Sequence, residues 1–273
     1  LTTLVLLALG IVSTCARFCI RVYVHHEFGI DDGFLLLGLC SVVVANALLL
    51  TVADSMYMDE ATLLGLNAVP PDDFLERIYY YQKIIVVSQI LAWLAVSSVK
   101  MSFLALFKKL VDPIPGLVLY WRVVLMFNIV VIVYGISVWF LSCPHFHSIK
   151  SIQCEYGEDL KNAVSYTISQ MVLDIFGDFM ILIIPAYLIW RIRIRWTQKV
   201  ALACSLCLTI VTIVFTVVRA VGMQYHGKLD AIWVNFWQLT AAEVGIILTA
   251  ITAFRVLFVA RRKAQEDRER DIE

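Results

Sequence analysis

Charged residues are scarce in this chain of 273 residues, and their scarcity indicates its solvent. Lys, Arg, Asp and Glu make up 16% of the residues, whereas apolar residues make up 61%. Soluble globular chains carry about 25% charged and about 45–50% apolar residues. Too few polar side chains are present to cover the folded chain in water, so we expect a lipid bilayer to surround it. The 22 basic and 22 acidic residues balance, and we expect no nucleic-acid partner.

The sequence also lacks the residue patterns of common enzymes and cofactor proteins. It contains no phosphate-binding loop, no nucleophile elbow and no His-Glu-x-x-His motif, so we do not expect an enzyme. All 5 histidines lie in or beside the predicted loops, whereas membrane metal and haem proteins need histidines inside the bundle. His145 and His147 could bind a metal at the surface, but we interpret them as exposed loop residues, and we predict neither metal nor cofactor.

Long apolar runs are what the sequence has in abundance. A run of about 20 residues crosses about 30 Å of hydrocarbon as a helix, and in lipid it must be helical because every backbone polar group needs an internal partner. No basic segment precedes the apolar run 4–12, so we interpret the first run as a transmembrane helix with upstream residues missing, and not as a signal peptide. The predicted spans are 1–23, 33–52, 79–107, 117–141, 164–190, 200–224 and 232–260.

These runs predict an all-α membrane protein, a bundle of seven transmembrane helices over 1–260 with a charged tail at 261–273. Basic residues are unevenly divided between the two sides of such a bundle, with 15 near one side and 5 near the other. The side rich in Lys and Arg faces the cytoplasm in membrane proteins. We therefore predict an N-terminus outside and a C-terminus in the cytoplasm, with the plasma membrane as the expected location.

Two of the 7 cysteines, Cys143 and Cys154, lie in one predicted loop. Charge counting places this loop outside the cell, where disulfides persist. We predict a disulfide that holds the connection between the fourth and fifth spans over the mouth of the bundle. Two free thiols are the alternative.

Five ionisable residues at membrane depth are the main candidates for a functional site, because a charge in hydrocarbon is costly and usually pairs or lines a polar cavity. They are Lys100, Asp174, Asp178, Arg219 and Glu243. Counting about 1.5 Å per residue from the outer ends, we predict one cluster of Lys100 with Asp178 toward the inner side. A second cluster would join Arg219 to Glu243 or Asp174 toward the outer side. The clusters could form a polar pocket or a latch, or they could be static pairs that hold helices together.

The predicted inner side carries two further features. Pro185 should bend the fifth span. The loop after it is basic, and we interpret it as an anchor to anionic lipid, with a cytoplasmic signalling partner as the alternative. Its basic residues are Arg191, Arg193, Arg195 and Lys199.

Several short patterns occur in a fixed order along nearly the whole chain. They are Arg17-Phe18 with Arg21, Asp31-Asp32, Val99-Lys100-Met101-Ser102, Cys143-Pro144 with Cys154, Asp178 through Pro185, Val218-Arg219, and Glu243. Together they resemble the fungal rhodopsin-domain integral membrane proteins. The resemblance implies a receptor-like architecture of seven transmembrane helices.

Retinal binding is not expected in spite of the family's name. Retinal needs a lysine for its Schiff base, normally in the last span, and the predicted last span contains Glu243 but no lysine.

We expect a receptor-like sensor with a small extracellular ligand. The alternative is a transporter or channel that uses the same buried charges for an ion or a small solute.

Overall fold

Seven helices account for most of the chain. The computed structural model describes residues 2–24, 29–63, 74–112, 114–142, 157–191, 196–225 and 228–270. Within these ranges the helices are α1 (Thr2–Val24), α2 (Ile30–Leu63), α3 (Phe74–Val111), α4 (Pro115–Ser142), α6 (Gly157–Arg191), α7 (Trp196–Val221) and α8 (Ala231–Arg270). A small antiparallel hairpin joins α7 to α8, formed by β1 (Gln224–Tyr225) and β2 (Lys228–Leu229).

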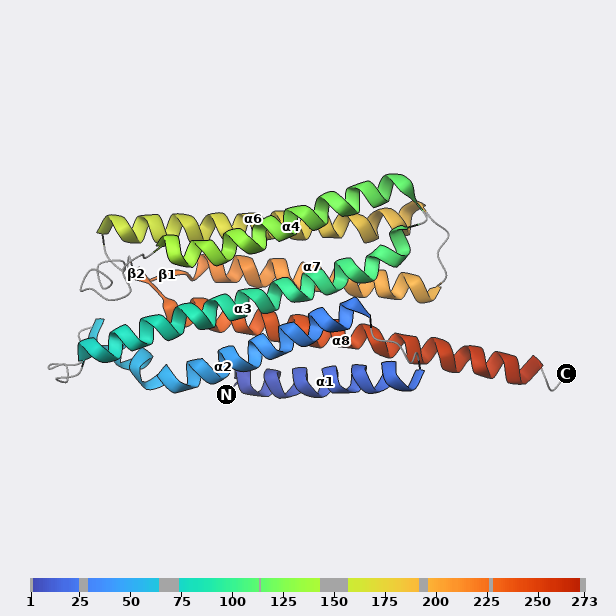
Figure 1. The fold of residues 1–273 in the computed structure, drawn as a ribbon, viewed down its shortest axis with the longest axis horizontal. Helices are drawn as coiled ribbons and strands as arrows, with labels where there is room; N and C mark the ends of the chain where they lie inside the picture. Colours follow the sequence, from blue (N-terminus) through green and yellow to red (C-terminus); the bar gives the residue numbers. More distant parts are fainter. Residues whose placement is uncertain are drawn as a thin grey trace.

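The helices run side by side in alternating directions (Figure 1). The C-terminal ends of α2 and α4 lie at the same end of the bundle as the β1–β2 hairpin, whereas the C-terminal ends of α3 and α6 lie at the opposite end. Helix α3 lies at the centre and packs against α2, α4 and α8, and α1 packs mainly against α8. The largest hydrophobic core follows α3, from Ala95 through Phe103 to Val111.

The surface of this bundle is apolar, and its interior contains polar side chains in addition to its hydrophobic core. Large apolar side chains such as Val5, Val130 and Phe176 are exposed, whereas Asn46, Gln89 and other polar side chains are buried. Six helices are long and apolar enough to cross a membrane, and α7 has a shorter described apolar stretch, Leu206–Val221. The predicted all-α membrane bundle is confirmed, while the orientation of its termini stays a prediction.

The helices extend beyond the apolar runs from which they were predicted. Helix α2 has 34 residues, whereas the predicted span 33–52 covers only its apolar part. Helix α8 continues to Arg270, because the residues after 260 are mainly Ala, Arg, Lys, Gln and Glu, which favour helix. The predicted border between bundle and tail therefore lies inside one continuous helix. Helix α6 likewise continues past Pro185 to Arg191.

Two tryptophans pack against glycines, one within a neighbouring helix and one directly after the end of a neighbouring helix. Trp93 of α3 is buried and donates its indole N–H to the carbonyl of Ile132 on α4, at 3.3 Å. A Cβ atom on Gly135 of α4 would overlap the Trp93 ring. Trp233 of α8 makes a similar contact with Gly222 and with the backbone of α7. Small residues let helix backbones approach closely in membranes, and here they make room for an indole.

We expect Gly135→Ala to destabilise the protein, because the added methyl group would force Trp93 out of its place. Overpacking of this kind costs about 1–3 kcal/mol, which should lower the thermal midpoint of the purified protein in detergent. Gly116→Ala in the same helix is the matched control, since a Cβ atom there meets nothing within 4 Å. Equal midpoints for the two variants would contradict this packing.

Candidate functional site

A buried arginine joins three helices at one end of the bundle. Arg17 of α1 is 1% exposed. Its Nη2 lies 2.6 Å from Oδ2 of Asp31 and its Nε lies 3.0 Å from Oδ1 of Asp32, both on α2. Its Nη1 donates to the backbone carbonyl of Thr249 on α8, at 2.7 Å. A charge in this position is stable only when it is paired and hydrogen-bonded, and the contacts of Arg17 meet both conditions.

A second arginine completes the cluster, which we call the four-charge network: Arg17, Arg21, Asp31 and Asp32. Arg21 pairs with Asp31 and, at 2.6 Å, with Asp32. Both acids lie in the first turn of α2, where the helix dipole favours negative charge. The hydroxyl of Ser102 on α3 donates to the carbonyl of Asp31 at 2.8 Å. The network is neutral and connects α1, α2, α3 and α8.

Sequence reasoning included these four residues in the family pattern but did not predict the ion pairs that join them. Arg17 and Arg21 were counted among basic residues facing the cytoplasm, whereas the structure buries Arg17 and pairs both with acids. Removing these two from the count of 15 leaves 13 against 5, so the predicted orientation is unchanged. The sequence did contain a signal for these pairs. Arg17 and Arg21 are four residues apart and therefore share a helix face, and Asp31 and Asp32 lie at the start of the next helix.

A lysine lies between two carboxylates near the middle of the bundle, and we call this group the Lys100 triad: Lys100, Asp174 and Asp178. Lys100 Nζ on α3 lies 2.8 Å from Oδ1 of Asp174 and 2.7 Å from Oδ1 of Asp178 on α6. Thr212 of α7 donates its hydroxyl to the other carboxylate oxygen of Asp178, at 3.1 Å. All three charged side chains are at most 8% exposed. The triad therefore contains one positive and two negative charges, and its side chains are almost completely shielded from solvent.

The predicted pair of Lys100 and Asp178 is present. Of the predicted second cluster, Arg219 and Asp174 line one cavity without forming an ion pair in the described part of the chain, and Glu243 has another partner. Asp174 binds Lys100, and within the described ranges Arg219 forms no ion pair. Glu243 instead accepts a hydrogen bond from the amide of Asn46 on α2, at 3.0 Å. The physical reason is that depth along a helix does not reveal which way a side chain points. Asp174 and Asp178 share one face of α6, and one lysine reaches both.

Two small cavities lie on either side of the triad. The first, which we call the Arg219 cavity, measures about 10 Å³, and the second measures about 20 Å³. Each has room for about one water molecule. Asp174 lines the first, Lys100 and Asp178 line the second, and Thr212 lines both.

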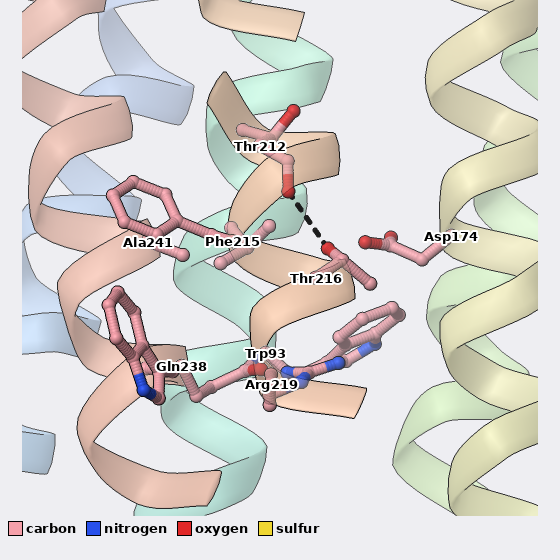
Figure 2. A pocket seen from close by; sticks show the side chains of 10 residues that line it. Trp93, Asp174, Thr212, Phe215, Thr216, Arg219, Gln238 and Ala241 are labelled. Atoms are coloured by element: carbon pink, nitrogen blue, oxygen red, sulfur yellow. Dashed lines mark hydrogen bonds between the residues drawn. The ribbon is translucent and has the colours of Figure 1, made fainter. Parts of the chain in front are cut away.

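The Arg219 cavity is enclosed by α3, α6, α7 and α8. Figure 2 shows Asp174 on α6 opposite Thr216 and Arg219 on α7, with Gln238 on α8 nearby. Arg219 is 7% exposed. Its Nε and the indole nitrogen of Trp237, which also lines the cavity, are buried without a hydrogen-bond partner in the described part of the chain. Buried donors without partners are costly, so this cavity is a candidate for binding an acceptor.

A polar stripe on α7 runs past both cavities. Thr209, Thr212, Thr216 and Arg219 have helical spacing and lie on one face of α7, and each is at most 7% exposed. Thr209 and Thr212 line the second cavity, while Thr212, Thr216 and Arg219 line the first. The stripe is thus a continuous row of polar side chains on the buried face of α7.

Some predicted site residues lie outside the described part of the structure. Cys143, Pro144 and Cys154 belong to this group, so their disulfide stays a prediction. The side chains of the basic loop, Arg191, Arg193, Arg195 and Lys199, are likewise not described.

Comparison with known families decides the identity of the bundle. The model of the fungal rhodopsin domain matches residues 16–260. The chain belongs to the fungal rhodopsin domain family. The matched range of this fungal rhodopsin domain contains the four-charge network, the Lys100 triad and both cavities. Searches of curated proteins and of solved structures gave no match.

We expect Arg17→Gln to destabilise the bundle strongly. The substitution would leave Asp31 and Asp32 buried with only Arg21, and removing one partner of a buried ion pair costs about 3–5 kcal/mol. The thermal midpoint in detergent measures the loss. Arg122→Gln on α4 is the matched control, because that side chain is exposed. If both variants melt together, the four-charge network does not stabilise the fold.

Charge balance in the Lys100 triad leads to a second expectation. Lys100→Met would leave two buried carboxylates that repel each other, so its thermal midpoint should fall. Asp178→Asn alone should change the midpoint little, because Lys100 keeps Asp174 as its partner. In the double variant, Asp178→Asn should recover part of the loss, with a coupling of about 0.5–3 kcal/mol. Strictly additive effects would show that the three groups do not act as one unit.

Proposed function

We propose that this fungal rhodopsin domain protein is a receptor-like sensor whose ligand site is the Arg219 cavity. One observation carries the proposal: Asp174 lines that cavity and also binds Lys100. A molecule entering the cavity would therefore meet a member of the ion triad that joins α3 to α6.

Charge arithmetic supports a latch with two states. The triad carries one positive and two negative charges, and Arg219 is a second cation that shares a cavity with Asp174. In one state Lys100 holds both acids, as described above. In the other, Arg219 takes Asp174 while Lys100 keeps Asp178. A ligand that interacts differently with the two states shifts the balance between them.

The latch would change how α6 and α7 pack against α3. Thr212 binds Asp178 and lines both cavities. A change of partner at Asp174 would therefore alter the contacts of the polar stripe of α7. The four-charge network holds α1, α2, α3 and α8 together, which gives α6 and α7 a fixed reference for their movement.

The remaining parts of the sensor belong to the proposal as well. We place the protein in the plasma membrane with its C-terminus in the cytoplasm and a Cys143–Cys154 disulfide over the outer mouth. The basic loop 191–199 would contact anionic lipid or a cytoplasmic signalling partner. Retinal is not the proposed ligand, because α8 contains no lysine before Lys263.

A transporter or channel is the second candidate. It is favoured by the two cavities, which lie along the polar stripe of α7 with the triad between them. In that function the triad would be a barrier that an ion or proton crosses.

Asp178→Asn separates the two functions. It should weaken the hold of Lys100 on α6 and thereby change the distance distribution between Lys108 on α3 and Trp190 on α6. Both positions are exposed, so spin labels can be attached there through bio-orthogonal residues. In proteoliposomes, flux of protons, potassium and chloride should stay at the background level for wild type and variant.

Asp54→Asn is the matched control, because Asp54 is exposed on α2 and should leave the distances unchanged. Flux that depends on Asp178 would establish the transporter instead. Unchanged distances without flux would contradict the latch.

A further inference from the structure

We infer that the Arg219 cavity binds a monovalent anion of halide size. The inference deepens the proposed sensor function, because it names the ligand class of the same cavity and rests on that proposal for its consequence. The binding chemistry itself depends only on the residues that line the cavity.

The donors that line the cavity are those that bind anions. The guanidinium of Arg219 carries a fixed positive charge, and its Nε–H has no partner in the described part of the chain. The indole N–H of Trp237, also without a partner there, can only donate. Gln238 adds an amide to the same wall. All three groups line one cavity, and we take them as the donors to an anion bound there.

Water alone would not solve the problem that Arg219 poses. A water molecule can accept from the Nε–H but brings no charge. Asp174, which faces Arg219 across the cavity, is already shared with Lys100, so the guanidinium charge stays only partly compensated in a medium of low dielectric constant, which is costly. An anion satisfies the donor and neutralises the charge together.

Size restricts the anion. The cavity measures about 10 Å³, which is room for about one water molecule, so a chloride ion requires only a small expansion and a carboxylate or phosphate requires more. Arg219 lies two residues from the end of α7 at Val221, or about 3 Å along the helix axis. The site is therefore close to the end of α7.

Asp174 is the carboxylate that an anion would meet in this cavity. Its charge is shared with Lys100 at 2.8 Å, which reduces its repulsion of the anion. An anion bound to Arg219 also removes the cation that competes for Asp174. The anion should therefore favour the state in which Lys100 holds both acids of the triad.

The experiment uses the full chain in detergent, with sodium chloride and sodium gluconate at equal ionic strength as probes, because gluconate is too large for the cavity. Chloride should raise the thermal midpoint in a saturable manner, and the protein should broaden the chloride magnetic-resonance line. Arg219→Gln should abolish both effects, whereas Arg122→Gln, at an exposed position of α4, should retain both.

Trp237→Phe covers the case in which Arg219→Gln does not fold. It removes one N–H donor and keeps the charge, so several-fold more chloride should be needed for the same rise in midpoint. The inference is overturned if chloride and gluconate give equal midpoints, or if the chloride effect persists unchanged in Arg219→Gln or Trp237→Phe.

Spin-label distances separate this inference from the proposed function. If chloride binds through Arg219 but the distances between α3 and α6 respond neither to chloride nor to Asp178→Asn, the anion site stands and the sensor latch fails. If the distances respond to Asp178→Asn but chloride has no effect, the latch stands and the anion site fails.

Discussion

The attraction between one lysine and two carboxylates is the constraint around which the middle of this bundle is arranged. Lys100 brings the central helix α3 against α6, and Thr212 extends the contact to α7. Charges in hydrocarbon are stable only with partners, so the triad couples the positions of these helices. Two cavities lie beside the triad, and one of them contains donors without a hydrogen-bond partner in the part of the chain that the structure describes.

The bundle contains a second constraint of a different kind. The four-charge network has equal numbers of positive and negative groups. It is completed by the backbone carbonyl of Thr249, which accepts from Arg17, and by the hydroxyl of Ser102, which donates to the backbone carbonyl of Asp31. A neutral, fully hydrogen-bonded network resists rearrangement, whereas the Lys100 triad has an excess acid with a nearby spare cation. The fold thus combines a stable attachment at one end with an unbalanced group near its centre, which is the combination that a conformational switch requires.

Hydropathy predicted the helices well because it reports a property of each segment alone. Every apolar run became a helix, since a backbone in lipid has no other way to satisfy its hydrogen bonds. Partners between helices depend on the rotation of each helix about its axis, which hydropathy does not contain. Lys100 and Asp178 were paired correctly from depth, but Arg219 and Glu243 point to different neighbours. The buried ion pairs of Arg17 were not predicted, because its position near a span end resembled that of an ordinary surface charge.

Helix α8 has a mechanical consequence that follows from its length. Its backbone holds Arg17 through the carbonyl of Thr249, and the helix then continues to Arg270, beyond the ends of its neighbours (Figure 1). The segment after Thr249 is about 30 Å long at about 1.5 Å per residue. Because α8 extends beyond the neighbours against which it packs, its far part acts as a lever arm, and a tilt of about 5° at Thr249 would displace the tip by about 3 Å. A small movement of α8 inside the bilayer would thereby displace any molecule in contact with its tip.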